Sequence, residues 1–178
     1  MTESARNTSE PYVSAGHGDA WAAEAASRGS IGTQRLLRVA VIDPAEEVAT
    51  ALGLKPGDQA VIRSRLILSD GRPVEIATSY YPASFAASTA LATPGKIKGG
   101  AVAVLADLGR SPSYVVEALT ARWPTPEEAR HLEVDDHEAL LVLSRTSFDR
   151  EGRPVEYAAN VSVGHRSAPH IYRLKVAA

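Results

Sequence analysis

The chain contains nearly the same segment twice, and this internal duplication constrains the fold more than any other feature. Arg63–Glu75 ends in Gly-Arg-Pro-Val-Glu, and so does Ser144–Glu156 about eighty residues later. In both copies an alternating apolar run that carries arginine enters an Asp- and Gly-containing turn, which is the pattern of a β-hairpin. Two such hairpins predict a pseudo-symmetric domain with something anionic between them.

The similarity continues upstream of both hairpins. The aligned pairs include Pro44 with Pro124, Glu47 with Glu127, Leu52 with Leu132, Ser64 with Ser144, and Arg65 with Arg145. Each unit is predicted to be strand, short helix, strand, turn and strand, over residues 35–81 and 115–162. Stacked arrays usually need at least about three repeats, so two units indicate one duplicated domain. The predicted fold class is α+β, a mainly antiparallel sheet with helices on it.

The overall composition narrows the class of protein. A length of 178 residues, 44% hydrophobic and 22% charged, fits one globular domain. The chain has no cysteine, and its net charge of −2 gives no general attraction to nucleic acid or anionic membranes. It also lacks an apolar run near the roughly 18 residues of a membrane span and the apolar segment of a signal peptide. A cytoplasmic location is expected, with no membrane partner and no direct binding of nucleic acid by this chain.

The first residues differ in composition from the rest. Residues 1–30 are rich in Ser, Gly and Ala and predict a flexible segment with a short helix over Asp19–Ser27, whereas residues 31–178 predict the folded domain. Trp21 lies on that helix, and two interpretations are open for it. The indole docks on the body of the domain, or it forms a lid over a pocket.

Local signals place the elements of the first unit and the cap of the second. Gln34–Ile42, Gln59–Leu68 and Val74–Tyr81 are aliphatic or alternating and predict strands. Asp43 is predicted to cap a helix whose first residue is Pro44. In the second unit Thr125 is expected to cap and Pro126 to begin the equivalent helix.

The segment between the units and the tail are not explained by the duplication. Ala83–Ala92 predicts an Ala-rich helix, and Ala101–Leu108 predicts a second one. Lys96-Ile-Lys-Gly-Gly100 before the second helix either binds an anion through converging backbone amides or is an ordinary turn. Ile171–Val176 could add a last edge strand.

Strand alternation puts Arg63 and Arg65 on one face together with Val61 and Ile67. Such a face is either a solvated edge or a charged patch that lines a cavity. On the equivalent face of the second unit Arg145 is the only arginine, and it aligns with Arg65.

Motifs of common chemistry are absent. The sequence has no nucleophile elbow, no P-loop and no His-Glu-x-x-His, and its histidines are scattered, so no metal is expected. Glu75 and Glu156 are repeat equivalents. They are either ordinary strand carboxylates or a general acid and base.

Seven segments of the chain resemble the effector-sensing UTRA domain of the HutC branch of GntR-type bacterial transcription regulators, which has a chorismate-lyase-like fold. They are Glu47–Asp58, Arg63–Arg65, Asp70–Pro73, Tyr80–Pro82, Lys98–Ala101, Thr125–Glu128 and Gly152–Glu156. Family members normally carry a winged helix-turn-helix before this domain. The roughly 30 residues that precede it here are too few and too rich in small residues for one, so the chain is expected to lack a DNA-binding head.

The resemblance implies a pocket for a small anionic metabolite, without a cofactor. It implies that Arg65 grips the anion, that the Gly99-Gly100-Ala101 turn offers backbone amides, and that Glu156 binds the rest of the effector. Arginine suits this role because its planar fork pairs with phosphate or carboxylate bidentately. The candidate ligand-binding residues are Arg63, Arg65, Tyr80, Gly99, Gly100, Ala101, Arg145, Glu156 and Asn160.

The chain departs from the family pattern of sugar-phosphate sensors at four positions, where Ile67, Ala77, Ala101 and Ser162 replace Arg, Glu, Ser and Tyr. These departures favour a smaller or less polar carboxylated ligand over a hexose phosphate. They also predict one asymmetric pocket in which Arg65 holds the anion and the second unit provides selectivity.

Three functions are compatible with these patterns. The first is a sensing domain that acts as a homodimer or as the partner of a full-length regulator. The second is a stand-alone lyase, isomerase or cyclase on the chorismate-lyase-like fold. The third is a purely structural dimerisation module, which leaves the two arginines Arg63 and Arg65 unexplained.

Overall fold

In the computed structural model, which describes residues 8–14 and 19–172, six strands form one antiparallel sheet of order β1-β2-β3-β6-β5-β4. The strands are β1 (Gly32–Ile42), β2 (Ala60–Ser69), β3 (Arg72–Pro82), β4 (Tyr114–Arg122), β5 (Leu140–Phe148) and β6 (Pro154–Val163). The two units meet where β3 pairs with β6, from Glu75 opposite Ser162 to Tyr80 opposite Tyr157. Each unit contributes three strands in mirrored order, so the predicted α+β fold with a duplicated strand-helix-hairpin unit is confirmed.

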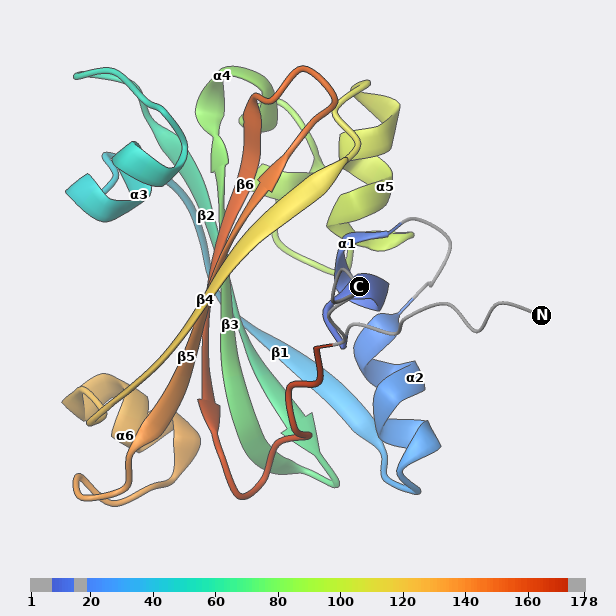
Figure 1. The fold of residues 1–178 in the computed structure, drawn as a ribbon, viewed down its shortest axis with the longest axis vertical. Coiled ribbons are helices and arrows are strands. Elements are labelled where there is room, and N and C mark those ends of the chain that lie inside the picture. Colours follow the sequence, from blue (N-terminus) through green and yellow to red (C-terminus); the bar gives the residue numbers. More distant parts are fainter. Residues whose placement is uncertain (1–7, 15–18, 173–178) are drawn as a thin grey trace, which may run out of the picture.

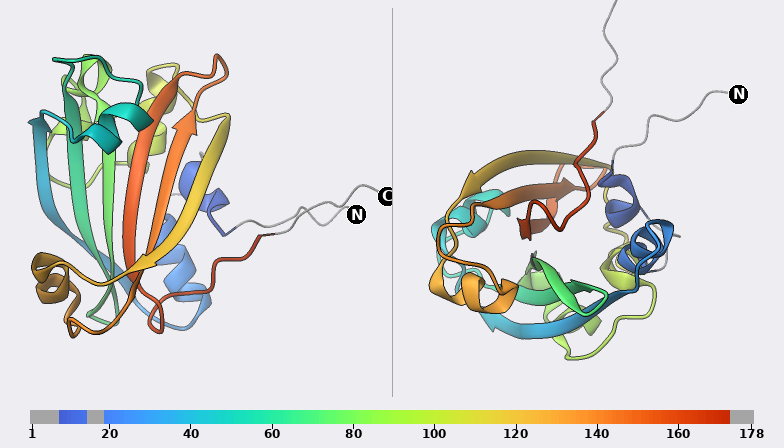
Figure 2. Two further views of the ribbon diagram at one scale, coloured as in Figure 1. Left: turned by 60° about the vertical axis from the view of Figure 1, so that its left-hand side comes forward. Right: turned by 90° about the horizontal axis from the view of Figure 1, so that it is seen from below.

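The helices lie on both faces of the sheet. They are α1 (Glu10–Val13), α2 (Ala20–Ser27), α3 (Glu46–Ala51), α4 (Ala83–Ala86), the 3-10 helix η1 (Ala90–Ala92), α5 (Gly100–Asp107) and α6 (Pro126–Leu132). The repeat-equivalent helices α3 and α6 cover one face, while α1, α2 and α5 lie over the other (Figure 1). Figure 2 shows that the sheet curls around this second side. Among the residues described, no helix is long and apolar enough to cross a membrane.

The apolar core follows the two faces. On the side of α6, Leu132 packs with strand residues such as Leu66 and Val163, all nearly inaccessible to solvent. On the side of α5, Leu105 and Leu91 pack with Tyr81 of β3. Because side chains are packed on both faces, the sheet holds the side chains that project from it in fixed positions.

The helix caps of the two units differ. Thr125 caps α6 and Pro126 begins it, as predicted, and Glu128 completes a capping box. The prediction for α3 was wrong, since its N-cap is Ala45 and no side chain caps it. Asp43 instead accepts a hydrogen bond from Gln59 Nε2 at 3.0 Å and so joins the start of the helix region to β2.

The predicted helix Ala83–Ala92 was also wrong, because the chain forms α4 and η1 there as two short pieces. Thr89 separates them, since its hydroxyl accepts from the backbone N–H of Leu91 and begins a new turn. At the tail, residues 171–172 form no strand, and the rest of the predicted strand Ile171–Val176 lies outside the described residues. The backbone carbonyl of Ile171 instead accepts from Thr8 N at 3.4 Å.

Helix α2 forms where it was predicted, with Asp19 as its N-cap. The docking interpretation of Trp21 is confirmed, because the indole packs on Ile67, Val74 and Ala77 of the sheet. The indole also lines a cavity, and its role as a lid stays a prediction. Its Nε1 donates to the Leu68 carbonyl at 3.0 Å. The predicted flexibility of residues 1–30 stays a prediction.

Gly32 allows α2 to approach the sheet closely. A Cβ at this position would lie 2.8 Å from both Ala25 Cβ and Trp21 Nε1. We therefore expect Gly32→Ala to push α2 away, to cost about 1–3 kcal/mol of stability, and to red-shift the emission of Trp21 in a Trp123→Phe background. Gly164→Ala is the matched control, since its nearest neighbour would be at an ordinary 3.7 Å. Identical emission in both variants would contradict the close packing.

Candidate ligand site

A cavity of about 1030 Å³ lies between the sheet and helices α1, α2 and α5. Eight of the nine candidate ligand-binding residues line it, namely Arg63, Arg65, Gly99, Gly100, Ala101, Arg145, Glu156 and Asn160. They come from β2, β5, β6 and the start of α5, so the fold brings together residues from both units. Their role in binding stays a prediction.

Tyr80 does not line the cavity. It stacks against Tyr157, with ring centroids 6.1 Å apart, and packs with the α3 residues Val48 and Leu52 on the other face of the sheet. Side chains alternate along β3, so the neighbouring Tyr81 faces the cavity instead. Its hydroxyl donates to Glu156 Oε1 at 2.9 Å, which fixes that carboxylate in a buried position.

The guanidinium of Arg63 is largely used by the protein itself. Arg63 is only 6% exposed, and its Nη1 donates to the Thr93 carbonyl at 2.8 Å while Nη2 donates to the Gly95 carbonyl. Burial and the neighbouring Arg65 lower the pKa of Arg63. Arg63 therefore fixes the loop that leads to α5 and has few donors left for a ligand.

Arg65, by contrast, keeps unused donors. Its Nη1 donates to Gln34 Oε1 at 3.2 Å, and its buried Nε has no hydrogen-bond partner among residues 8–14 and 19–172. A buried donor without a partner is unfavourable unless a ligand or water satisfies it. Arg65 is thus the arginine of this cavity best suited to an anion.

Arg145 has a different environment from its repeat equivalent Arg65. It forms an ion pair with Glu117 of β4 at 3.7 Å, and the two side chains are only 7% and 8% exposed. Arg145 Nε, Glu117 Oε1 and the hydroxyl of the fully buried Ser147 have no hydrogen-bond partners. In the second unit the charge of Arg145 is therefore neutralised by Glu117, whereas in the first unit Arg65 has no carboxylate partner among the described residues.

Glu75 lines the cavity without the hydrogen bond that its repeat equivalent Glu156 accepts. It makes no hydrogen bond or ion pair with any described residue, and burial raises its pKa to about 7, although Arg65 and Arg145 act in the opposite direction. Its repeat equivalent Glu156 has Tyr81 as a donor, whereas Ser162 lies opposite Glu75 in the β3–β6 ladder. Ser162 is also the repeat equivalent of Tyr81, so Glu75 has no tyrosine donor there and lines the cavity without one.

The turn before α5 reaches the cavity through glycines. Gly99 and Gly100 have φ of 77° and 75°, a region that favours glycine, and a Cβ on Gly99 would lie 2.8 Å from Ala103 Cβ. Gly99 is the N-cap of α5 and no side chain caps this helix. The Gly100 N–H donates to the Ile97 carbonyl at 3.0 Å, so the N–H groups of the first turn that remain beside the cavity begin at Ala101.

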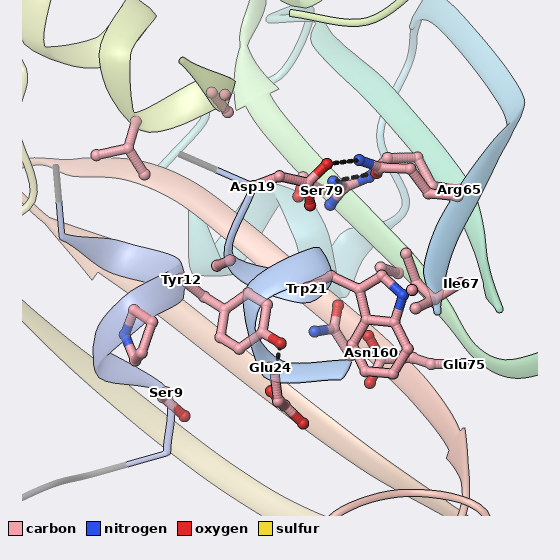
Figure 3. A pocket seen from close by; sticks show the side chains of 18 of the residues that line it. Ser9, Tyr12, Asp19, Trp21, Glu24, Arg65, Ile67, Glu75, Ser79 and Asn160 are labelled. Carbon is pink, nitrogen blue, oxygen red and sulfur yellow. Dashed lines mark hydrogen bonds between the residues drawn. The ribbon is translucent and has the colours of Figure 1, made fainter. Parts of the chain in front are cut away.

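The sequence reasoning missed a second group of cavity residues. Tyr12, Asp19 and Glu24 come from the N-terminal helices, and Gln34 and Lys96 come from β1 and the loop before α5. Figure 3 shows Tyr12, Trp21 and Glu24 pointing from these helices toward Glu75 and Asn160 on the sheet. Strand alternation could have predicted that Gln34 and Glu75 face the cavity. No local sequence pattern predicts where the N-terminal helices pack.

The sequence matches the UTRA domain over residues 27–167, and the chain therefore belongs to this family. The family assignment rests on this match, and the relatives described next are transcriptional regulators.

Two relatives carry the description HTH-type transcriptional regulator. One, from Streptomyces coelicolor, is 37% identical over 124 residues, which are 68% of this chain and 46% of that protein. The other, from Rhizobium meliloti, is 37% identical over 131 residues, or 72% and 52% of the two chains. The chain thus spans about half the length of these relatives.

Solved structures agree on the fold. The effector domain of PhnF from Mycobacterium smegmatis has a TM-score of 0.71 at 22% identity, covering 85% of this chain and 91% of that one. The C-terminal domain of the histidine utilization repressor from Pseudomonas syringae pv. tomato has a TM-score of 0.69 at 17% identity, covering 81% and 99%.

Proposed function

We propose that this domain senses a small metabolite with a carboxylate or phosphate group, within a HutC-type regulator. The observation that carries the proposal is Arg65, which lines a cavity of about 1030 Å³ and whose buried Nε has no hydrogen-bond partner among the described residues. An arginine fork in a partly desolvated site pairs strongly with a planar anion. The volume is at the upper end of small-molecule pockets, so it accommodates a metabolite together with ordered water.

The rest of the ligand is expected to carry hydrogen-bond donors. Glu75 accepts no hydrogen bond from the described residues, and the Asn160 side chain also lines the cavity without a hydrogen bond to a described residue. A hydroxyl or amino group placed here would satisfy the Glu75 carboxylate. Ile67 stands beside them and offers an apolar wall, which supports a ligand less polar than a hexose phosphate.

Sensing requires that the ligand bind one arrangement of the regulator better than another. We propose that the domain acts as a homodimer or with a full-length regulator, and that ligand binding shifts the arrangement of the partners. The exposed edge strand β4 supports pairing between copies, because Tyr114, Val116 and Leu119 are solvent-exposed there. Direct DNA binding by this chain is not expected, since its net charge is −2.

A stand-alone enzyme is the second candidate, and Glu75 is the observation in its favour. A carboxyl group whose pKa is about 7 is suited to general acid–base chemistry at neutral pH. Mass spectrometry of ligand recovered after incubation distinguishes the two functions. Recovery of unchanged ligand supports the sensor, and conversion that disappears in Glu75→Gln supports the enzyme.

We expect a matching metabolite to raise the melting temperature of the domain. At a concentration one hundred times the dissociation constant, binding adds about 2.7 kcal/mol of stability, or roughly 5–10 °C for a domain of this size. The measurement is a thermal-shift screen of carboxylates and phosphates, in which Arg65→Ala should abolish the response. The exposed Arg72→Ala removes the same charge and should leave the response intact. A response that persists in Arg65→Ala would contradict the assigned anion site.

A further inference from the structure

The N-terminal segment forms a cover over the cavity. Helices α1 and α2 lie on the cavity side of the sheet, and almost all of this segment precedes residue 27, where the family match begins. Tyr12 donates a hydrogen bond to Glu24, which joins the two helices. Figure 3 shows both side chains beside the cavity together with Trp21.

Asp19, at the start of α2, connects this cover to the cationic side of the cavity. Its Oδ2 accepts from Lys96 Nζ at 3.1 Å and from Gln34 Nε2 at 3.4 Å. Gln34 in turn accepts from Arg65 Nη1 through its Oε1 at 3.2 Å. The Asp19 carboxylate is thus bound directly to Lys96, and it is connected to Arg65 through the side-chain amide of Gln34.

The other two arginines of the cavity are committed elsewhere. Arg63 is bound to the carbonyls of Thr93 and Gly95, and Arg145 is paired with Glu117. An anion that binds the open donors of Arg65 and Lys96 therefore lies beside the network around Asp19 and competes with it for Arg65 Nη1 and Lys96 Nζ. The negative charge of Asp19 also opposes a second anion nearby.

We propose that Asp19 is an internal competitor for the anionic group of the ligand, so that ligand binding loosens the N-terminal cover. This inference rests on the proposed anion site at Arg65. It adds Asp19, Gln34 and Lys96 to the residues that determine affinity. It also gives the cavity a direct connection to the segment that precedes the family domain.

The ion pair between Asp19 and Lys96 is weak enough for an anionic ligand to replace Asp19. The side chains of Lys96 and Asp19 are 76% and 28% exposed. An exposed ion pair of this kind changes an equilibrium constant by no more than about fivefold. Burial raises the pKa of Asp19, but hydrogen bonds from Ala22 N and Lys96 outweigh it and lower the pKa overall, so the competing carboxylate is ionised at neutral pH.

Movement of Asp19 reaches α2 directly. Asp19 Oδ1 accepts from the backbone N–H of Ala22 at 3.1 Å and caps the helix. A carboxylate that turns away from Lys96 changes the position of this first turn. Trp21 lies two residues after this cap, and its Nε1 donates to the Leu68 carbonyl. The emission of the indole should therefore report a shift of the first turn of α2.

The test compares Asp19→Asn with the parent protein, using inorganic phosphate as the probe at constant ionic strength. Asparagine preserves the helix cap and removes the charge, so folding should be unaffected. In a Trp123→Phe background, phosphate is expected to change the emission of Trp21. Its dissociation constant should fall about three- to fivefold in Asp19→Asn, and amide exchange over residues 20–27 should quicken when phosphate is added to the parent. Asp107→Asn, which removes an exposed carboxylate from α5, should behave as the parent does.

The outcomes separate this inference from the proposed function. Equal dissociation constants in the parent and Asp19→Asn, with binding lost in Arg65→Ala, would overturn the competition and leave the anion site in place. Phosphate binding that is present in the parent and absent from Asp19→Asn would also overturn only the competition. Phosphate binding that survives Arg65→Ala, or is absent from both the parent and Asp19→Asn, would overturn both.

Discussion

Replacing Glu75 with glutamine should stabilise the domain at pH 8 by about 2–3 kcal/mol, which corresponds to a rise in melting temperature of about 4–12 °C. The half-buried carboxylate lines the cavity between the sheet and the N-terminal helices, and no described residue donates a hydrogen bond to it. Burial raises its pKa to about 7 from an ordinary value of 4.5. Glutamine has the same shape but requires no charge to be buried.

The sign of the pH dependence follows from this shift. Between about pH 4.5 and pH 7 the unfolded chain has released the Glu75 proton and the folded chain still holds it. The folded state therefore binds more protons, and stability falls as pH rises through this window. Glu75→Gln should remove this fall, and below about pH 4.5 the two proteins should be alike.

Denaturant unfolding at several pH values between 4 and 8 measures the effect. Glu46→Gln is the control, because Glu46 is exposed on α3 and should leave the profile of the parent unchanged. Parallel curves for Glu75→Gln and the parent would show that Glu75 is already ionised in the fold. In that case the absence of a donor opposite Ser162 would have no energetic consequence.

The duplication made much of this fold predictable. Two strand-helix-hairpin units with one pattern predict a single antiparallel sheet, because hairpins joined edge to edge leave each helix free to cover one face. Alternation along β2 correctly placed Arg63 and Arg65 on one face. The same rule applied to β3 puts Tyr80 on the face opposite Glu75, whereas the prediction of Tyr80 as a ligand-binding residue came from the family motif.

The remaining features depend on contacts between distant segments. Arg63 is used by carbonyls of Thr93 and Gly95, about thirty residues away, and a sequence does not reveal that loop's path. The pairing of Arg145 with Glu117 depends on the β4–β5 register. The docking of α2 depends on the absence of a side chain at Gly32. None of these contacts leaves a periodic signal along the chain.

Arg65 and Arg145 are equivalent in the sequence, and their replacement should have opposite consequences. We expect Arg145→Ala to cost about 3 kcal/mol of stability, because it leaves Glu117 buried without a counter-charge. Arg65→Ala should cost about 1 kcal/mol or less, because only the hydrogen bond to Gln34 is lost. Ligand affinity should show the reverse order, with the larger loss in Arg65→Ala.

A double variant separates the charge of the Arg145–Glu117 pair from its shape. In Arg145→Met with Glu117→Leu, apolar side chains of similar volume replace the ion pair, and most of the lost stability should return. Chemical denaturation of the single and double variants gives the coupling between the two positions. Small and equal losses in Arg145→Ala and Arg65→Ala, both in stability and in ligand binding, would restore a symmetric cavity with two equivalent anion sites. The expected inequality instead means that one unit of the duplication keeps its arginine open for a ligand, while the other has enclosed its arginine in the sheet.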